Sequence, residues 1–127
     1  MYYGYYHMEE KNKQTNFHFQ LRSKLDEYVH KVYDVTLHFP SNEQFGVTSQ
    51  LRRATLSIML NYIEGFARKR KLVLKQFLEI SYGSLKESGY LLLFSHKRGY
   101  MNEKNYLELS KLADELGRMI WGILEKI

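Results

Sequence analysis

Glu27 and His30 are the residues whose types and spacing come nearest to a metal site. A Glu-x-x-His pair places both side chains on one face of a helix, and helical bundles build carboxylate-bridged metal centres from two such pairs and two more glutamates. None of the other four histidines has an acid three residues earlier. Glu27 and His30 also fall off the apolar stripe of their segment, so we expect His30 to be a surface residue and no metal to bind.

Nucleophilic catalysis finds no better support in the sequence. Ser49, Ser57 and Ser81 fall in predicted helices without an evident base beside them, and there is no glycine-rich phosphate loop, nucleophile elbow or zinc-protease helix. The absence of cysteine excludes thiol chemistry, cysteine-ligated zinc and disulfides. We therefore expect neither an enzyme nor a cofactor.

The elements that hold these residues belong to one domain. The chain has 127 residues, of which 44% are hydrophobic and 26% charged, with a single proline. Residues 1–16 hold four tyrosines and a polar stretch without helical periodicity, which predicts a flexible arm; its tyrosines could stack on nucleic-acid bases or serve as an unstructured tail. No apolar run is long enough to span a bilayer, so we expect a cytoplasmic protein without membrane partners.

Apolar spacing predicts a first helix that ends before Pro40. Its stripe alternates steps of four and three residues, and the residue before a proline disfavours the helical conformation. Ser41 and Gln44 resemble a capping box for a short turn that Gly46 ends. The predicted stripe consists of Leu21, Leu25, Tyr28, Val32, Val35 and Phe39.

Three further helices follow. The helix over 47–67 is apolar over so much of its circumference that we expect burial on two sides, either at the centre of its own bundle or against another subunit. The helix from Leu72 carries small residues that suggest a neighbouring backbone packed very close, and Gly99 is expected to close it. Asn102 is expected to cap the last helix. Residues 17–127 thus predict an all-α, up-and-down antiparallel four-helix bundle.

The net charge of +5 comes from the middle of the chain. Residues 47–75 hold seven basic side chains and one acid, Glu64, for a local charge of +6. Such a run is often a solvated face, but a one-sided block also favours a polyanionic partner. The candidate nucleic-acid-binding residues are Arg52, Arg53, Arg68, Lys69, Arg70, Lys71 and Lys75.

These cations cannot form one patch on a monomer. Arg52 and Arg68 are sixteen residues apart, or about 24 Å along a helix. We expect residues 68–75 near Arg22 and Lys24 at one end of the bundle, with Arg52 and Arg53 near Lys97, Arg98 and Lys104 at the other. Each end is modest alone, and repetition around an oligomer would add their effects.

A series of ordered motifs runs through residues 21–127: Phe39-Pro40, the run from Phe45 to Ala54, Ser57-Ile58, Asn61, Glu64-Gly65, Arg68, Phe77-Leu78, the run from Tyr82 to Leu85, Glu87 and Gly99-Tyr100. These motifs resemble the four-helix bundle family encoded in 23S rRNA intervening sequences, also labelled S23 ribosomal protein. This family includes the accessory variability determinant proteins of diversity-generating retroelements. The resemblance implies a homopentameric ring without known catalysis, which in the retroelement branch binds a reverse transcriptase and nucleic acid; Arg52, Arg53 and Arg68 are the matching basic positions.

Two functional hypotheses follow. The first is a non-enzymatic homo-oligomer that binds RNA or DNA through basic surfaces, as the accessory partner of a reverse transcriptase in the retroelement branch. The alternative is a structural interaction protein of the intervening-sequence type, whose charges only keep it in solution and which has no intrinsic affinity for nucleic acid.

Overall fold

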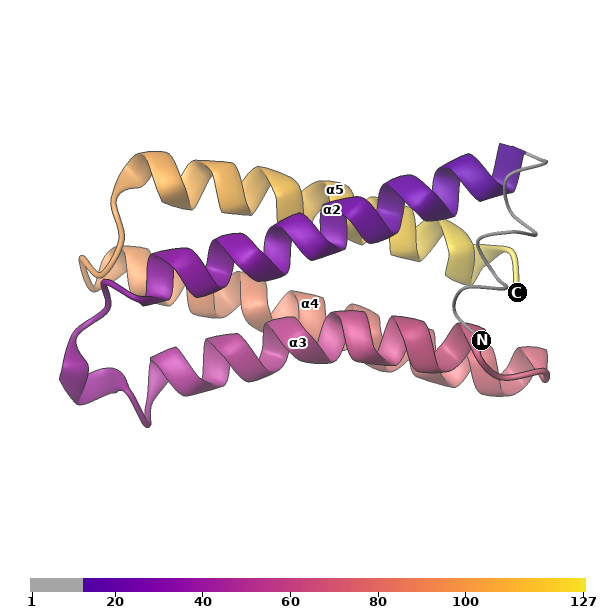
Figure 1. The fold of residues 1–127 in the computed structure, drawn as a ribbon, viewed down its shortest axis with the longest axis horizontal. Coiled ribbons are helices and arrows are strands. Elements are labelled where there is room, and N and C mark those ends of the chain that lie inside the picture. The colour runs from indigo at the N-terminus through magenta and orange to yellow at the C-terminus, as the bar shows by residue number, and fades with distance from the viewer. Residues whose placement is uncertain (1–12) are drawn as a thin grey trace.

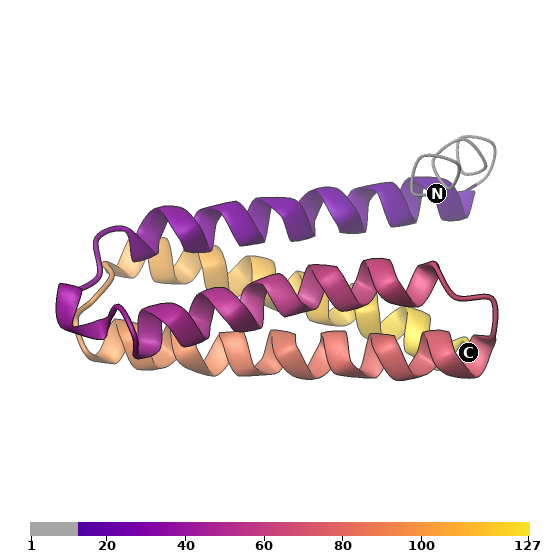
Figure 2. The same cartoon turned by 60° about the horizontal axis from the view of Figure 1, so that its bottom comes forward.

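The computed structural model describes residues 13–127, which form four long helices and one short 3-10 helix. Consecutive long helices run in opposite directions, and each packs against two neighbours (Figures 1 and 2). The predicted all-α, up-and-down antiparallel four-helix bundle is confirmed. In chain order the elements are α2 (Lys13–Thr36), η1 (Ser41–Glu43), α3 (Val47–Phe66), α4 (Lys71–Lys97) and α5 (Glu103–Glu125).

The two ends of the bundle differ in the connections they carry. The segment between α3 and α4 lies at the end where α2 begins and α5 finishes, which we call the connector end (Figure 1). The α2–α3 and α4–α5 connections lie at the opposite end, which we call the turn end. Residues 1–12 lie outside the described residues, so the predicted arm over 1–16 is described only for residues 13–16, which belong to α2.

The segment between α2 and α3 differs in detail from its prediction. Residues 37–39 form i, i+3 backbone bonds, so α2 ends at Thr36, before the predicted position. The predicted capping box of Ser41 and Gln44 is wrong, because η1 begins without a side-chain cap. The Glu43 carboxylate instead accepts the backbone N–H of Val47 at 3.2 Å, at the start of α3.

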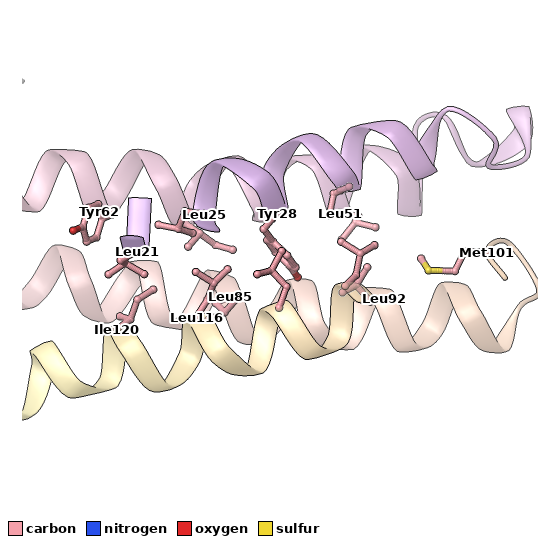
Figure 3. Close-up of a cluster of buried hydrophobic side chains, with 14 of the residues drawn as sticks. Leu21, Leu25, Tyr28, Leu51, Tyr62, Leu85, Leu92, Met101, Leu116 and Ile120 are labelled. Atoms are coloured by element: carbon pink, nitrogen blue, oxygen red, sulfur yellow. The ribbon is translucent and has the colours of Figure 1, made fainter. Parts of the chain in front are cut away.

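The core consists of one apolar stripe from each long helix, as the periodicity predicts. Figure 3 shows these side chains along the bundle axis, from Tyr62 and Leu21 to Met101. Tyr28 is the largest α2 side chain that is fully buried, and its hydroxyl lies 2.8 Å from that of Ser88 on α4. Burial of such side chains stabilises the fold by about 1.5–3 kcal/mol each. The fully buried aliphatic members are Leu21, Leu25, Val32, Leu51, Ile58, Leu78, Leu92, Leu109, Leu116 and Ile120.

Small residues bring α3 and α4 together, as predicted, but only some of them take part. Ser81 is fully buried, and its hydroxyl donates to the Ile58 carbonyl of α3 at 2.7 Å. Gly65 also faces this contact, because a Cβ placed there would lie 3.1 Å from the Phe77 Cβ. Gly83 and Gly89 have open space instead. The serines and Gly65 therefore account for the close packing.

Helix α3 leaves one flank uncovered. It occupies one corner of the bundle, between α2 and α4, so the expectation of a central position is wrong. Leu56 and Leu60 on its outward side are 36% and 60% exposed. The alternative, in which this flank meets another subunit, stays a prediction.

The last connection follows its prediction closely. Gly99 has a φ of +79°, in the left-handed region that favours glycine after a helix. The Asn102 side chain accepts the N–H of Asn105 at 2.7 Å, which caps α5. Within residues 13–127, no helix combines the length and the hydropathy needed to cross a membrane.

Candidate nucleic-acid interface

The connector between α3 and α4 carries the densest group of exposed cations. Helix α3 ends at Phe66, and Arg70 is extended before α4 begins at Lys71. The side chains of Lys69, Arg70 and Lys71 are exposed, and Lys75 lies half-buried one turn into α4. We call Lys69, Arg70 and Lys71 the connector cations.

The start of α4 adds a backbone contribution of the same sign. The first turn of a helix presents unpaired N–H groups and a partial positive charge. Helix α4 has no acidic residue in its first turn, and the side chain of its N-cap residue, Arg70, makes no capping hydrogen bond. The connector cations and the helix end therefore repel one another, and a bound anion such as phosphate would relieve that repulsion.

Arg68 is held within the chain more firmly than its neighbours. Its guanidinium pairs with the Glu64 carboxylate four residues earlier, as the spacing predicts. It also lies over the Phe77 ring, 5.3 Å from the centroid. Arg68 therefore links the end of α3 to α4 and borders the connector cations.

Arg52 and Arg53 are adjacent in the chain, but their side chains have different contacts. The Arg52 Nε donates to the Thr36 hydroxyl at 2.8 Å, and its guanidinium lies 4.6 Å from the centre of the Tyr33 ring. It thus ties α3 to α2. Arg53 is exposed on the side of α3 that faces α4.

Arg22 and Lys24, the cations predicted to lie beside residues 68–75, do not add to the exposed charge of the connector end. Arg22 is buried, with 4% exposure, and burial lowers the pKa of its guanidinium below the usual value for arginine. Lys24 pairs with Glu115 of α5 at 3.2 Å. At the turn end, Lys97, Arg98 and Lys104 are all exposed. The two basic ends are therefore separate on one chain.

The Glu-x-x-His pair of Glu27 and His30 lies on the outside of α2. Glu27 and His30 are both exposed, and the His30 Nε2 lies 3.5 Å from the Asp26 carboxylate. In the part of the chain that the structure describes, no group of three histidine or acidic side chains could hold a metal ion.

A groove between α3 and α4 was missed by sequence reasoning. It has a volume of about 610 Å³ and lies on the outer face of this helix pair. The small residues at 54, 57 and 84 were the available signal, but only the register between the helices places them together. The groove is lined by Gln50, Arg53, Ala54, Ser57, Ser84, Glu87, Tyr90 and Leu91.

Comparison with known proteins identifies relatives of this bundle. Residues 18–122 match the family described as 23S rRNA-intervening sequence protein. A crystal structure of a protein of unknown function from the S23 ribosomal protein family of Bacteroides thetaiotaomicron is similar in fold, with a TM-score of 0.75 and 21% identity. The match covers 82% of this chain and 97% of that one. No curated protein matches the chain.

Proposed function

Because the chain belongs to the family of 23S rRNA-intervening sequence proteins, we propose that it is a cytoplasmic, non-enzymatic, homo-oligomeric bundle that binds RNA or DNA through basic surfaces. The observation that carries this proposal is the group of connector cations. Lys69, Arg70 and Lys71 are exposed and adjoin the positive end of α4. Phosphate is the anion that a nucleic acid presents to such a surface.

Oligomerisation would raise the affinity of these modest surfaces. One connector contacts few phosphates, and affinity grows with the number of phosphates neutralised. Several connectors held in one assembly would act together on one nucleic acid. The exposed Leu56 and Leu60 support this part of the proposal, because they offer an apolar flank for a second copy. The family resemblance suggests a pentamer.

Binding of a structured RNA at low salt tests the proposal. We expect the wild type to bind and the triple variant Lys69→Gln, Arg70→Gln, Lys71→Gln to bind much more weakly. Arg68 is left intact because its contacts with Glu64 and Phe77 hold two helices together. The matched control replaces the exposed Lys86, Lys111 and Arg118 by glutamine, which removes the same charge elsewhere. An equal loss of RNA affinity in both variants would show that only the net charge of the protein matters, and not the position of the connector cations.

The alternative function is a structural interaction protein without intrinsic affinity for nucleic acid. The apolar flank of α3 favours it as much as it favours the first proposal. A stable oligomer that binds no RNA at low salt would support this alternative and end the nucleic-acid proposal.

The most specific form of the proposal assigns a reverse transcriptase as protein partner, as in the retroelement branch that the chain resembles. The neighbouring genes test it. A reverse transcriptase gene with a repeat pair nearby would support the assignment, and a position inside an rRNA gene would contradict it.

A further inference from the structure

The groove between α3 and α4 has the size and the polar floor of a small-molecule site. Its volume of about 610 Å³ falls within the range of about 300–1,000 Å³ that is common for ligand pockets. The hydroxyls of Ser57 and Ser84 meet across its floor at 2.8 Å. Asn61 donates to the Ser57 hydroxyl at 2.9 Å, which fixes the orientation of this pair. The floor is therefore ordered by the protein itself.

The register between the helices places an unpaired cation and an anion on opposite walls. Because α3 and α4 are antiparallel, one turn before Ser57 on α3 lies opposite one turn after Ser84 on α4. These positions are Arg53 and Glu87, whose side chains are exposed. Both line the groove, but within residues 13–127 no ion pair joins them. Both charges are thus available to a ligand.

An aromatic ring stands at the far end of the same groove. Tyr90 lies almost one further turn along α4, and it is 63% exposed. Its ring centroid is 6.4 Å from that of Phe94, which supports one side of it. Exposed aromatic rings are the usual stacking platforms for unpaired bases.

We infer that this groove binds a single guanine nucleotide. Arg53 would hold the phosphate, Tyr90 would stack on the base, and the Glu87 carboxylate would accept the N1–H and the exocyclic amine of guanine. A carboxylate has acceptors only, and guanine is the base whose pairing edge offers two adjacent donors. Adenine offers one donor and one acceptor at that edge. This inference rests on the proposed function insofar as the nucleotide belongs to a bound RNA strand.

Titration of the full chain with GMP, AMP and guanosine tests the inference. We expect GMP to bind more tightly than AMP, and Glu87→Gln to remove about tenfold of that preference. Glu79→Gln, an exposed acid on the same helix, is the matched control and should leave it unchanged. Arg53→Gln should lower the affinity for GMP to that for guanosine. Tyr90→Leu should lower the affinity for all three ligands, and Tyr90→Phe should keep the wild-type affinity.

Short oligonucleotides show whether the groove binds a free nucleotide or a nucleotide within an RNA strand. If the groove reads RNA, a uridine oligomer containing one guanine should bind more tightly than one containing adenine in its place. If it takes only a free nucleotide, GMP should bind and the two oligomers should not differ. Both results support the guanine site. The triple variant of the connector cations should have a lower affinity for the oligomers and an unchanged affinity for GMP. Failure of the proposed function and failure of this inference are therefore distinguishable.

Two results would overturn the inference. The first is equal or absent binding of GMP and AMP to the wild type and to a monomeric Leu60→Asp variant. The second is a preference for GMP over AMP that Glu87→Gln and Arg53→Gln both leave unchanged, which would place the nucleotide outside the groove.

Discussion

At the residue scale, Tyr28 shows how a polar group in the core makes stability depend on pH. The Ser88 hydroxyl donates to the Leu85 carbonyl at 2.7 Å, so it accepts its other bond from the Tyr28 hydroxyl at 2.8 Å. Burial raises the pKa of Tyr28 from 10.0 to about 12. The folded state therefore favours the neutral phenol, and this contribution to stability is present below pH 10 and lost as the pH rises toward 12.

Tyr28→Phe tests this dependence. At neutral pH the variant should lose about 1 kcal/mol with the hydrogen bond. Between pH 10 and 12 the free energy of unfolding of the wild type should fall by about 2 to 3 kcal/mol more than that of the variant. Urea unfolding at several alkaline pH values measures both. Parallel curves for the two proteins would show that Tyr28 does not titrate on unfolding.

At the scale of elements, Gly65 is one of the residues that allow α3 and α4 to approach closely. An alanine at Gly65 would place its Cβ 3.1 Å from Phe77 Cβ and from Leu74 Cδ1, and the first of these atoms cannot move without the backbone. We expect Gly65→Ala to lower stability by about 1 to 3 kcal/mol, despite its better helix propensity. Gly83→Ala on α4 meets nothing within 4 Å and should raise stability by about 0.5 to 1 kcal/mol. Chemical denaturation compares them, and equal effects would contradict the close approach.

The elements also show how far sequence reasoning extends. Periodicity predicts the buried stripes, because a core-facing residue recurs every three or four positions. The residue types glycine and asparagine predict the caps at Gly99 and Asn102, because a cap depends on neighbouring residues alone. Neither signal predicts that Arg52 donates a hydrogen bond to Thr36, because that bond joins residues of two helices.

The candidate site was only partly predictable for the same reason. The connector cations follow from a local charge run, and the structure finds them exposed at the end of the bundle. The sequence predicts that Arg22 adds to this surface, but its position beside Leu21 on the inner side of α2 buries it. The groove between α3 and α4 depends on helix register, which no spacing within a single helix contains.

At the scale of the whole molecule, the outward flank of α3 predicts self-association. We expect light scattering of the wild type to give a multiple of the 15.3 kDa chain mass. Leu60→Asp should reduce that mass toward one chain, because it places a charge on an exposed apolar flank. Leu107→Asp alters a similarly exposed leucine on α5 and should leave the assembly intact. A wild type that stays monomeric at micromolar concentration would remove the oligomer from the proposal.

The salt dependence of RNA binding is the sharpest test of whether the connector cations bind nucleic acid. Each phosphate neutralised contributes about −0.9 to the slope of log K against log salt for a duplex and about −0.7 for a single strand. We expect a steep negative slope for the wild type, and a slope shallower by about 2 to 3 per connector when Lys69, Arg70 and Lys71 become glutamine. An unchanged slope in that variant, or no binding of the wild type at low salt, would contradict it.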